Sequence, residues 1–278
     1  MSAGQAVAGG VTLIGWPQLL LASSFVVVTG GLALWMRLGV TRDLAIATVR
    51  TYVQLLLLGL VLGWVFRFDR WWAVVAILGL MTVTASRIVL KRAPDAPSGL
   101  FLTAVTSMAV TGLTVTFAVT GLVIGAEPWY DPRTVIPIAG MVLGNSMTGI
   151  ALSFERVFAD MDARSGEILA MTALGASPWE ASHPSIRSAL RAGLIPAINA
   201  MAAAGIVFIP GMMTGQILAG ADPLEATKYQ IVVMLMIAAA EMIGALLAVL
   251  MSYRRRFDRD GVFMQRSYRE LPQPKGTQ

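Results

Sequence analysis

Long apolar runs with almost no charge are the strongest constraint on this chain. Of its 278 residues, 56% are hydrophobic and only 13% are charged, whereas soluble domains carry about 25% charged residues. A helix needs roughly 20 apolar residues to cross the hydrocarbon core of a bilayer. Runs of that length recur along the sequence, which therefore predicts an all-α polytopic membrane protein.

The apolar runs predict seven transmembrane helices. They cover residues 16–36, 44–66, 71–90, 99–124, 134–154, 192–218 and 229–252. The second is the least uniform, because Arg50 and Gln54 lie inside it, and a six-span arrangement would omit the first or the second. No Lys or Arg precedes Arg37, so the basic segment of a cleaved signal is missing and we expect the first span to be retained. Residues 1–256 form one transmembrane domain in this interpretation, and 257–278 form a polar, loosely ordered tail.

Basic side chains concentrate in alternate loops and set the expected orientation. The richer side carries Arg37, Arg42, Lys91, Arg92, Arg156, Arg164, Arg187, Arg191, Arg254, Arg255, Arg256 and Arg259. The opposite loops carry only Arg67, Arg70, Arg133 and Lys228. The positive-inside rule makes the richer side cytoplasmic. We therefore expect a protein of the plasma (bacterial inner) membrane, with the N-terminus outside and the C-terminus inside. The net charge of +5 then reflects orientation in the lipid bilayer and not nucleic-acid binding.

Several chemistries are excluded or disfavoured by composition. The chain has no cysteine, which excludes disulfides and thiolate chemistry, and its single histidine, His183, disfavours a histidine-built metal site or catalytic triad. Paired carboxylates and a nucleophile–base pair are missing, so no catalytic residues are expected and a membrane enzyme is disfavoured. No Gly-x-x-x-x-Gly-Lys-[Ser/Thr] segment is present, so we expect the chain to bind no nucleotide or other cofactor itself.

The longest polar segment, at about 155–191, joins the fifth and sixth expected spans and lies in the cytoplasm in this orientation. A short helix is expected to start near Ser165 and to end at Gly175. Ser177 and Glu180 predict a capping box for a second helix, which the His183-Pro184 pair is expected to break or kink. Two interpretations follow: an interfacial amphipathic connector, or an element that docks into a groove of a cytoplasmic protein.

The residues of this segment carry a resemblance. The pattern Glu167-x-x-Ala170 followed by ALGAS at 173–177 resembles the EAA-type coupling loop of ABC-transporter permeases. It departs from that pattern at Ile168, where alanine is usual, and in the longer distance from Gly175 to Pro196. Two flanking stretches, GMVLGNSM at 140–147 and PGMMTGQILAG at 210–220, resemble the FetB-type permease family. The resemblance covers about residues 40–260, and that family includes bacterial iron exporters and plant aluminium-tolerance half-transporters.

The resemblance implies a permease subunit without an ATPase of its own, exporting iron or another metal. A homodimer of permeases would assemble with two cytoplasmic ABC ATPase subunits, which would bind ATP and Mg. The implied ATPase-docking residues are Glu167, Leu169, Ala170, Ala173, Leu174, Gly175, Ala176 and Ser177. Two alternatives stay open: an ABC permease for a nucleotide-sugar or lipid-like cargo, and a secondary transporter that needs no ATPase.

Polar groups within the expected spans predict a pathway or gate. The candidates are Asn145, Pro210, Gly211, Met212, Met213, Thr214, Gln216 and Glu241. Glu241 lies near the middle of the last span, where ionisable residues are costly and commonly functional; the alternative is a structural hydrogen bond between helices. Arg50 is its possible charge partner, unless it reaches the interface along its own stem.

The Pro210-Gly211 pair interrupts the sixth expected span, because proline removes a helical hydrogen bond. Backbone groups freed at membrane depth require protein or a wet cavity around them, which predicts a gate, although a simple packing kink would give the same pattern. Met212 and Met213 could bind a soft metal or only fill apolar space. Oxygen ligands are too few to predict a metal site, so iron follows from the resemblance alone.

Overall fold

The computed structural model describes residues 7–8, 11–12, 15–68, 70–93, 97 and 99–264. The described chain is almost entirely helical, which confirms the all-α fold class; its strands, β1 (Val7–Ala8) and β2 (Val11–Thr12), pair antiparallel over two residues each. The chain divides into two compact units. Unit 1 comprises Met1–Arg70 and Pro210–Gln230, and unit 2 comprises Trp71–Ile209 and Ile231–Gln278.

Unit 1 contains α1 (Trp16–Trp35), α2 (Thr41–Phe68), α8 (Gly211–Leu218) and the first residues of α9 (Pro223–Ser252). Helices α1 and α2 are joined by a polar contact at Tyr52, whose hydroxyl donates to the Leu19 carbonyl oxygen at 3.0 Å and lies 2.7 Å from the Ser23 hydroxyl. Only 6% of the apolar window of α1 and none of that of α2 is buried. Their apolar surfaces are therefore free to face lipid.

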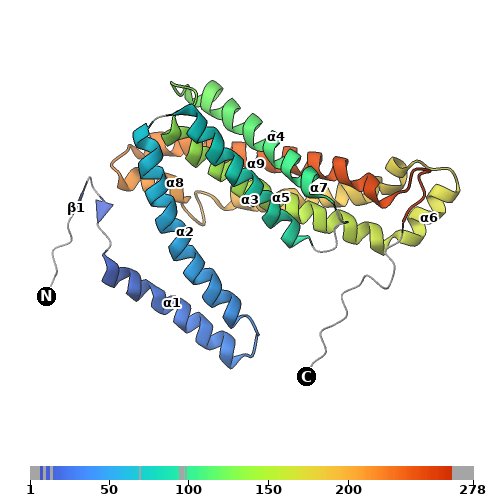
Figure 1. Cartoon of the computed structure of the whole chain (residues 1–278), viewed down its shortest axis with the longest axis horizontal. Coiled ribbons are helices and arrows are strands. Elements are labelled where there is room, and N and C mark those ends of the chain that lie inside the picture. Colours follow the sequence, from blue (N-terminus) through green and yellow to red (C-terminus); the bar gives the residue numbers. More distant parts are fainter. Residues whose placement is uncertain are drawn as a thin grey trace. The chain divides into compact units, whose positions relative to one another are not determined.

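Unit 2 contains the remaining elements. They are α3 (Trp71–Arg92), α4 (Phe101–Ala118), the π-helix η1 (Val119–Ile124), α5 (Pro132–Ala163), α6 (Ser165–Ala173), α7 (Pro178–Ala203), the rest of α9 and the 3-10 helix η2 (Tyr253–Arg256). Figure 1 shows α5 running through the middle of this unit, with α6 forming the turn between α5 and α7 at one end. The core is continuous, and the rings of Phe154 and Phe158 stack inside it at a centroid distance of 6.2 Å.

Helices α5 and α7 approach each other most closely at two glycines. A Cβ placed on Gly193 would overlap the Ser153 hydroxyl and would lie 2.9 Å from the Gly149 carbonyl oxygen. A Cβ on Gly149 would lie 3.1 Å from the Gly193 carbonyl oxygen. Ser153 completes the crossing by donating to the Ala189 carbonyl oxygen at 3.2 Å. Small residues at helix crossings in membranes allow such backbone contact.

Six helices within the described residues are long and apolar enough to cross a membrane. They are Trp16–Trp35, Thr41–Arg67, Trp71–Arg92, Phe101–Ile124, Pro132–Ala163 and Pro223–Arg256. These match six of the seven expected spans. The remaining span, predicted at 192–218, is wrong as a continuous helix, because α7 ends at Ala203 and α8 begins only at Gly211. Two residues interrupt the helix between α7 and α8. Gly205 has a left-handed φ of 79°, and Pro210 has no N–H to donate and caps α8.

The segment expected to open the polar tail at 257 packs on the core instead. Phe257 and Phe263 are both buried, their rings meet edge to face at 5.4 Å, and the two residues form a β-bridge. These aromatic side chains supply the apolar area that keeps residues 257–264 in place. The predicted disorder of 265–278 concerns residues outside the described part of the chain.

Replacing Gly193 with alanine should destabilise unit 2, because the new methyl group would displace the Ser153 hydroxyl and press on the backbone of α5. Overpacking of this kind costs roughly 1–3 kcal/mol, so the thermal midpoint of the detergent-solubilised protein should fall. The matched control is Gly144→Ala on the partner helix α5, where a Cβ would meet nothing within 4 Å. Equal midpoints for the two variants would contradict the close crossing.

Candidate functional site

Helix α6 presents one anchored face and one free face. Ile168 is fully buried in the core of unit 2, and Leu169 packs against the same core. On the other side Ala170 and Ala173 are exposed, and Leu174 is 90% exposed. Ala170, Ala173 and Leu174 are spaced three and four residues apart, so they form one exposed apolar stripe along α6.

The end of α6 is fixed by the expected glycine. Gly175 has a φ of 92° and donates its N–H to the Thr172 carbonyl oxygen at 3.0 Å, while the Ala176 N–H donates to Met171 at the same distance. This pair of bonds is a Schellman motif, which requires a left-handed residue at the first position after the cap. Leu174 therefore has a defined position, although it contacts little of its own chain.

The predicted capping box at the start of α7 is confirmed. The Ser177 hydroxyl accepts from the Glu180 N–H at 3.3 Å, and the Glu180 carboxylate accepts from the Ser177 N–H at 2.8 Å. Hydrogen bonds from the Ser177 side chain and backbone lower the pKa of Glu180. Of the break or kink expected at Pro184, the break is wrong, because α7 continues through it to Ala203.

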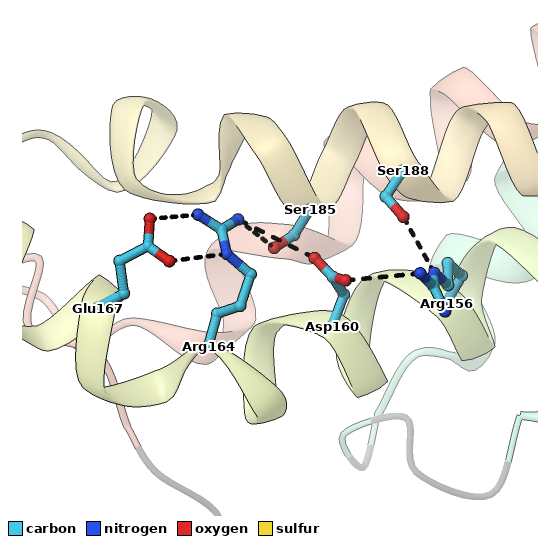
Figure 2. A network of polar contacts seen from close by, with 6 residues as sticks. All are labelled: Arg156, Asp160, Arg164, Glu167, Ser185 and Ser188. Atoms are coloured by element: carbon cyan, nitrogen blue, oxygen red, sulfur yellow. Dashed lines mark hydrogen bonds and ion pairs between the residues drawn. The ribbon is translucent and has the colours of Figure 1, made fainter.

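Charged residues tie the ends of α5, α6 and α7 together, as Figure 2 shows. Arg164 binds both oxygens of Glu167, at 2.9 and 2.5 Å, and donates to Ser185 on α7 at 3.3 Å. Its other acidic neighbour, Asp160, lies 4.0 Å away and also lies 3.8 Å from Arg156. The hydrogen bond from Arg164 lowers the pKa of Glu167. The Glu167 carboxylate is thus held by a residue of its own chain. Among the predicted docking residues, the exposed apolar ones are Ala170, Ala173 and Leu174.

A buried ion pair that the sequence did not reveal closes the same end of unit 2. Arg256, whose side chain is only 8% exposed, donates to the Asp162 carboxylate at 2.6 Å. Its guanidinium also lies 5.7 Å from the centre of the Phe158 ring. The partners are 94 residues apart in the sequence, so no local pattern could have indicated the pair. It joins η2, which follows α9, to the end of α5.

Glu241 is buried inside unit 2, on α9 against the α5–α7 crossing. Its side chain is 2% exposed, and its Cβ and Cγ lie 3.3 Å from the position that a Cβ on Gly149 would occupy. The Ala197 N–H is directed toward its carboxyl group, but the Oε2 atom has no hydrogen-bond partner among the described residues. None of the ion pairs found in that part of the chain includes Glu241.

Other hydroxyl groups near this carboxyl group also lack partners. Ser146 lies one turn before Gly149 on α5, and Thr111 of α4 lies 3.4 Å from the position of a Cβ on Gly244, one turn after Glu241. Both hydroxyl oxygens are buried and unpaired among the described residues. Buried polar atoms are normally hydrogen-bonded, so this polar layer of Thr111, Ser146 and Glu241 has unused capacity for a water, proton or cation.

The other predicted pathway residues are distributed over both units. Asn145 is half-buried on α5 and uses its amide to donate to Met141 of its own helix at 2.8 Å. Pro210 caps α8, which carries Gly211, Met212, Met213, Thr214 and Gln216. Within unit 1 the Thr227 hydroxyl donates to the Met213 sulfur at 3.9 Å, and the buried Gln216 oxygen has no partner among the described residues. The pairing of Arg50, exposed on α2, with Glu241 stays a prediction, because the two belong to different units.

Sequence comparisons connect this architecture to known proteins. Residues 16–257 match the profile of the uncharacterised protein family UPF0014. The UPF0014 membrane protein slr1647 of Synechocystis is 35% identical, with 88% of this chain and 93% of the relative covered. The UPF0014 membrane protein STAR2 of Oryza sativa subsp. japonica is 33% identical over 85% of this chain and 81% of its own length. The probable iron export permease protein FetB of Escherichia coli is 31% identical, covering 87% and 92%. No solved structure matches the chain.

The helices and the relatives define the class first: this is an integral membrane protein with an all-α fold. The chain belongs to the UPF0014 family, which confirms the resemblance to the FetB-type family carried by the stretches at 140–147 and 210–220.

Replacing Ser177 with alanine should loosen the start of α7, because it removes the hydroxyl of the capping box. Loss of such a cap raises local opening about fivefold, which hydrogen–deuterium exchange of residues 178–182 would measure. The pKa of Glu180 should also rise toward its ordinary value of 4.5. Because the pKa of Glu180 is lower in the native state than in the unfolded chain, its carboxylate stabilises the native state at pH values above the unfolded pKa. This stabilisation is lost as the pH falls through the lower native pKa. Unchanged exchange in the variant at neutral pH would contradict the role of the cap.

Proposed function

We propose that this chain is the membrane-spanning permease subunit of an ABC transporter, driven by a separate cytoplasmic ATPase. The observation that carries the proposal is the free face of α6. Ile168 fixes the helix in the core, while Ala170, Ala173 and Leu174 remain available to a partner. A short helix with a projecting apolar side chain is the kind of element that fits a hydrophobic groove.

The polar contacts around α6 support mechanical coupling to the spans. Arg164 links α6 to α7, and the buried Arg256–Asp162 pair links α5 to α9. Movement of a bound ATPase would therefore act on three long helices together, because their ends are tied at one place. In this proposal the ATPase binds ATP and Mg, the permease is a homodimer, and α6 faces the cytoplasm as the distribution of Arg and Lys predicts.

The proposed cargo is iron or another metal ion, moving outward. The name of the Escherichia coli relative, probable iron export permease protein, supports this cargo class. The polar layer at Glu241 supplies carboxylate and hydroxyl oxygens at membrane depth, and oxygen ligands suit hard cations. Pro210 and helix α8, both in unit 1, form the proposed gate, in which backbone groups free of helical bonds require a polar surrounding.

Leu174→Asp should abolish association with the ATPase while leaving the permease folded, because the side chain is 90% exposed and contributes little to the core. The tagged chain would be purified from its native host, and the eluate tested for a protein with Walker A and B motifs and for Mg-dependent ATP hydrolysis. Leu38→Asp is the matched control, since Leu38 is 56% exposed in a different loop expected on the cytoplasmic side. ATPase activity that copurifies equally with both variants would exclude docking through α6.

Glu241→Gln should reduce metal-stimulated ATP hydrolysis by the complex in proteoliposomes, because the amide keeps the shape of the side chain but removes its charge. The effect follows from the buried position of Glu241 and its unpaired oxygen. Glu225→Gln, on the exposed start of α9, is the control and should leave stimulation unchanged.

The same buried carboxyl group favours a second candidate function, a secondary transporter in which Glu241 carries a proton or ion. Metal transport by the purified chain without any ATPase, lost in Glu241→Gln, would support that function over the ABC permease. Stimulation by a nucleotide-sugar or lipid and not by metal would keep the ABC architecture and change the cargo.

A further inference from the structure

A basic cleft lies beside the coupling end of unit 2, between α5 and α7. Its volume is about 650 Å³, and the lining residues that matter here are Arg156, His183, Arg187, Ser188, Arg191 and Ile195. All six belong to unit 2, and α7 contributes every one except Arg156. The docking face of α6 and the polar layer at Glu241 share none of these residues.

The charge of the cleft is largely uncompensated. Arg187 and Arg191 are exposed, and neither forms an ion pair with a described residue. Arg156 donates to the Ser188 hydroxyl at 2.9 Å and forms an ion pair with Asp160 at 3.8 Å, as Figure 2 shows, so the unpaired charge belongs to Arg187 and Arg191. Three guanidinium groups around one cleft provide the forked donors that phosphate oxygens prefer.

The cleft changes from basic to apolar along α7. Arg187, Arg191 and Ile195 are spaced four residues apart and so lie on one side of the helix. Helix α7 is not one of the six helices long and apolar enough to cross a membrane. Its apolar end at the cleft, formed by Ala192 and Ile195, begins the apolar stretch at 192–218, whereas Arg187 and Arg191 precede that stretch and Arg156 follows the fifth expected span. A phosphate with hydrocarbon chains attached presents the same order of groups.

We infer that this cleft binds the phosphate of an anionic glycerophospholipid, with Arg156, Arg187 and Arg191 around the phosphate and Ile195 against the acyl chains. Ser188, held by Arg156, provides a neutral donor at the same place. Inorganic phosphate would leave the apolar end, where Ile195 is exposed, without a contact. The bound lipid would fill the space between α5 and α7 next to the network that fixes α6.

Native mass spectrometry of the detergent-solubilised full-length protein tests this site. The protein is titrated with dioleoylphosphatidylglycerol or dioleoylphosphatidylcholine. The wild-type chain should prefer the anionic lipid on the order of tenfold, from the attraction of several cations near one phosphate, and Arg187→Gln with Arg191→Gln should lose that preference. The matched control, Arg254→Gln with Arg259→Gln, removes two exposed arginines from the same expected side of the membrane and should keep it.

Further arms separate the other sources of the same chemistry. Replacing Arg187 and Arg191 with lysine keeps the charge and should preserve most of the preference. Millimolar inorganic phosphate should not displace the bound lipid; displacement would assign the cleft to free phosphate and overturn the lipid proposal. Equal preference in the wild-type and glutamine variants would also overturn it. If those variants kept the preference but lost a copurifying ATPase, the cleft would belong to a protein partner instead. Unchanged gel-filtration elution and helical circular dichroism show that each variant is folded.

Discussion

The close crossing of α5 and α7 is the interaction on which the rest of unit 2 depends. Gly149 and Gly193 bring the two backbones together, and that contact leaves room for Glu241 of α9 to lie directly over Gly149. The basic cleft lies on the side of the crossing that leads to α6, and it is lined by Arg156 of α5 and by residues of α7. In a membrane, helices associate through close packing and polar contacts because lipid provides no hydrophobic driving force between them. A larger side chain at either glycine would disturb both the polar layer and the coupling end.

Polar groups at the coupling end have two distinct physical roles. The Arg164–Glu167 contact is exposed, so it orients α6 but adds little to stability. The Arg256–Asp162 pair is largely buried and stands beside Phe158, so removing one partner would leave an uncompensated charge in the core. Together they hold α6 at a fixed angle while its outer face stays free. A helix that is anchored on one side and exposes an apolar side chain on the other is suited to transmit movement of a bound partner to the membrane helices.

The comparisons and the geometry support different parts of the proposed mechanism. Family membership connects the chain to membrane proteins, among them one named as a probable iron export permease. The free face of α6 supports a protein partner, the polar layer supports a cation or proton at membrane depth, and the arginine cleft supports an anionic lipid. These three sites are separate in the residues that form them, so variants at one can be interpreted without loss of the others.

The sequence by itself determined the membrane class, six of the spans, the capping box at Ser177 and the glycine stop at Gly175, because apolar length and helix-end chemistry are local properties. It also identified Glu241, since an ionisable residue inside an apolar run is conspicuous without a fold. Only the tertiary structure decided that α7 and α8 are separate helices, that Phe257 and Phe263 join the core, and that Leu174 is free while Ile168 is buried. It alone brought Arg256 to Asp162 and three arginines to one cleft, because contacts between residues far apart in the chain depend on how the helices pack and leave no periodic signal in the sequence.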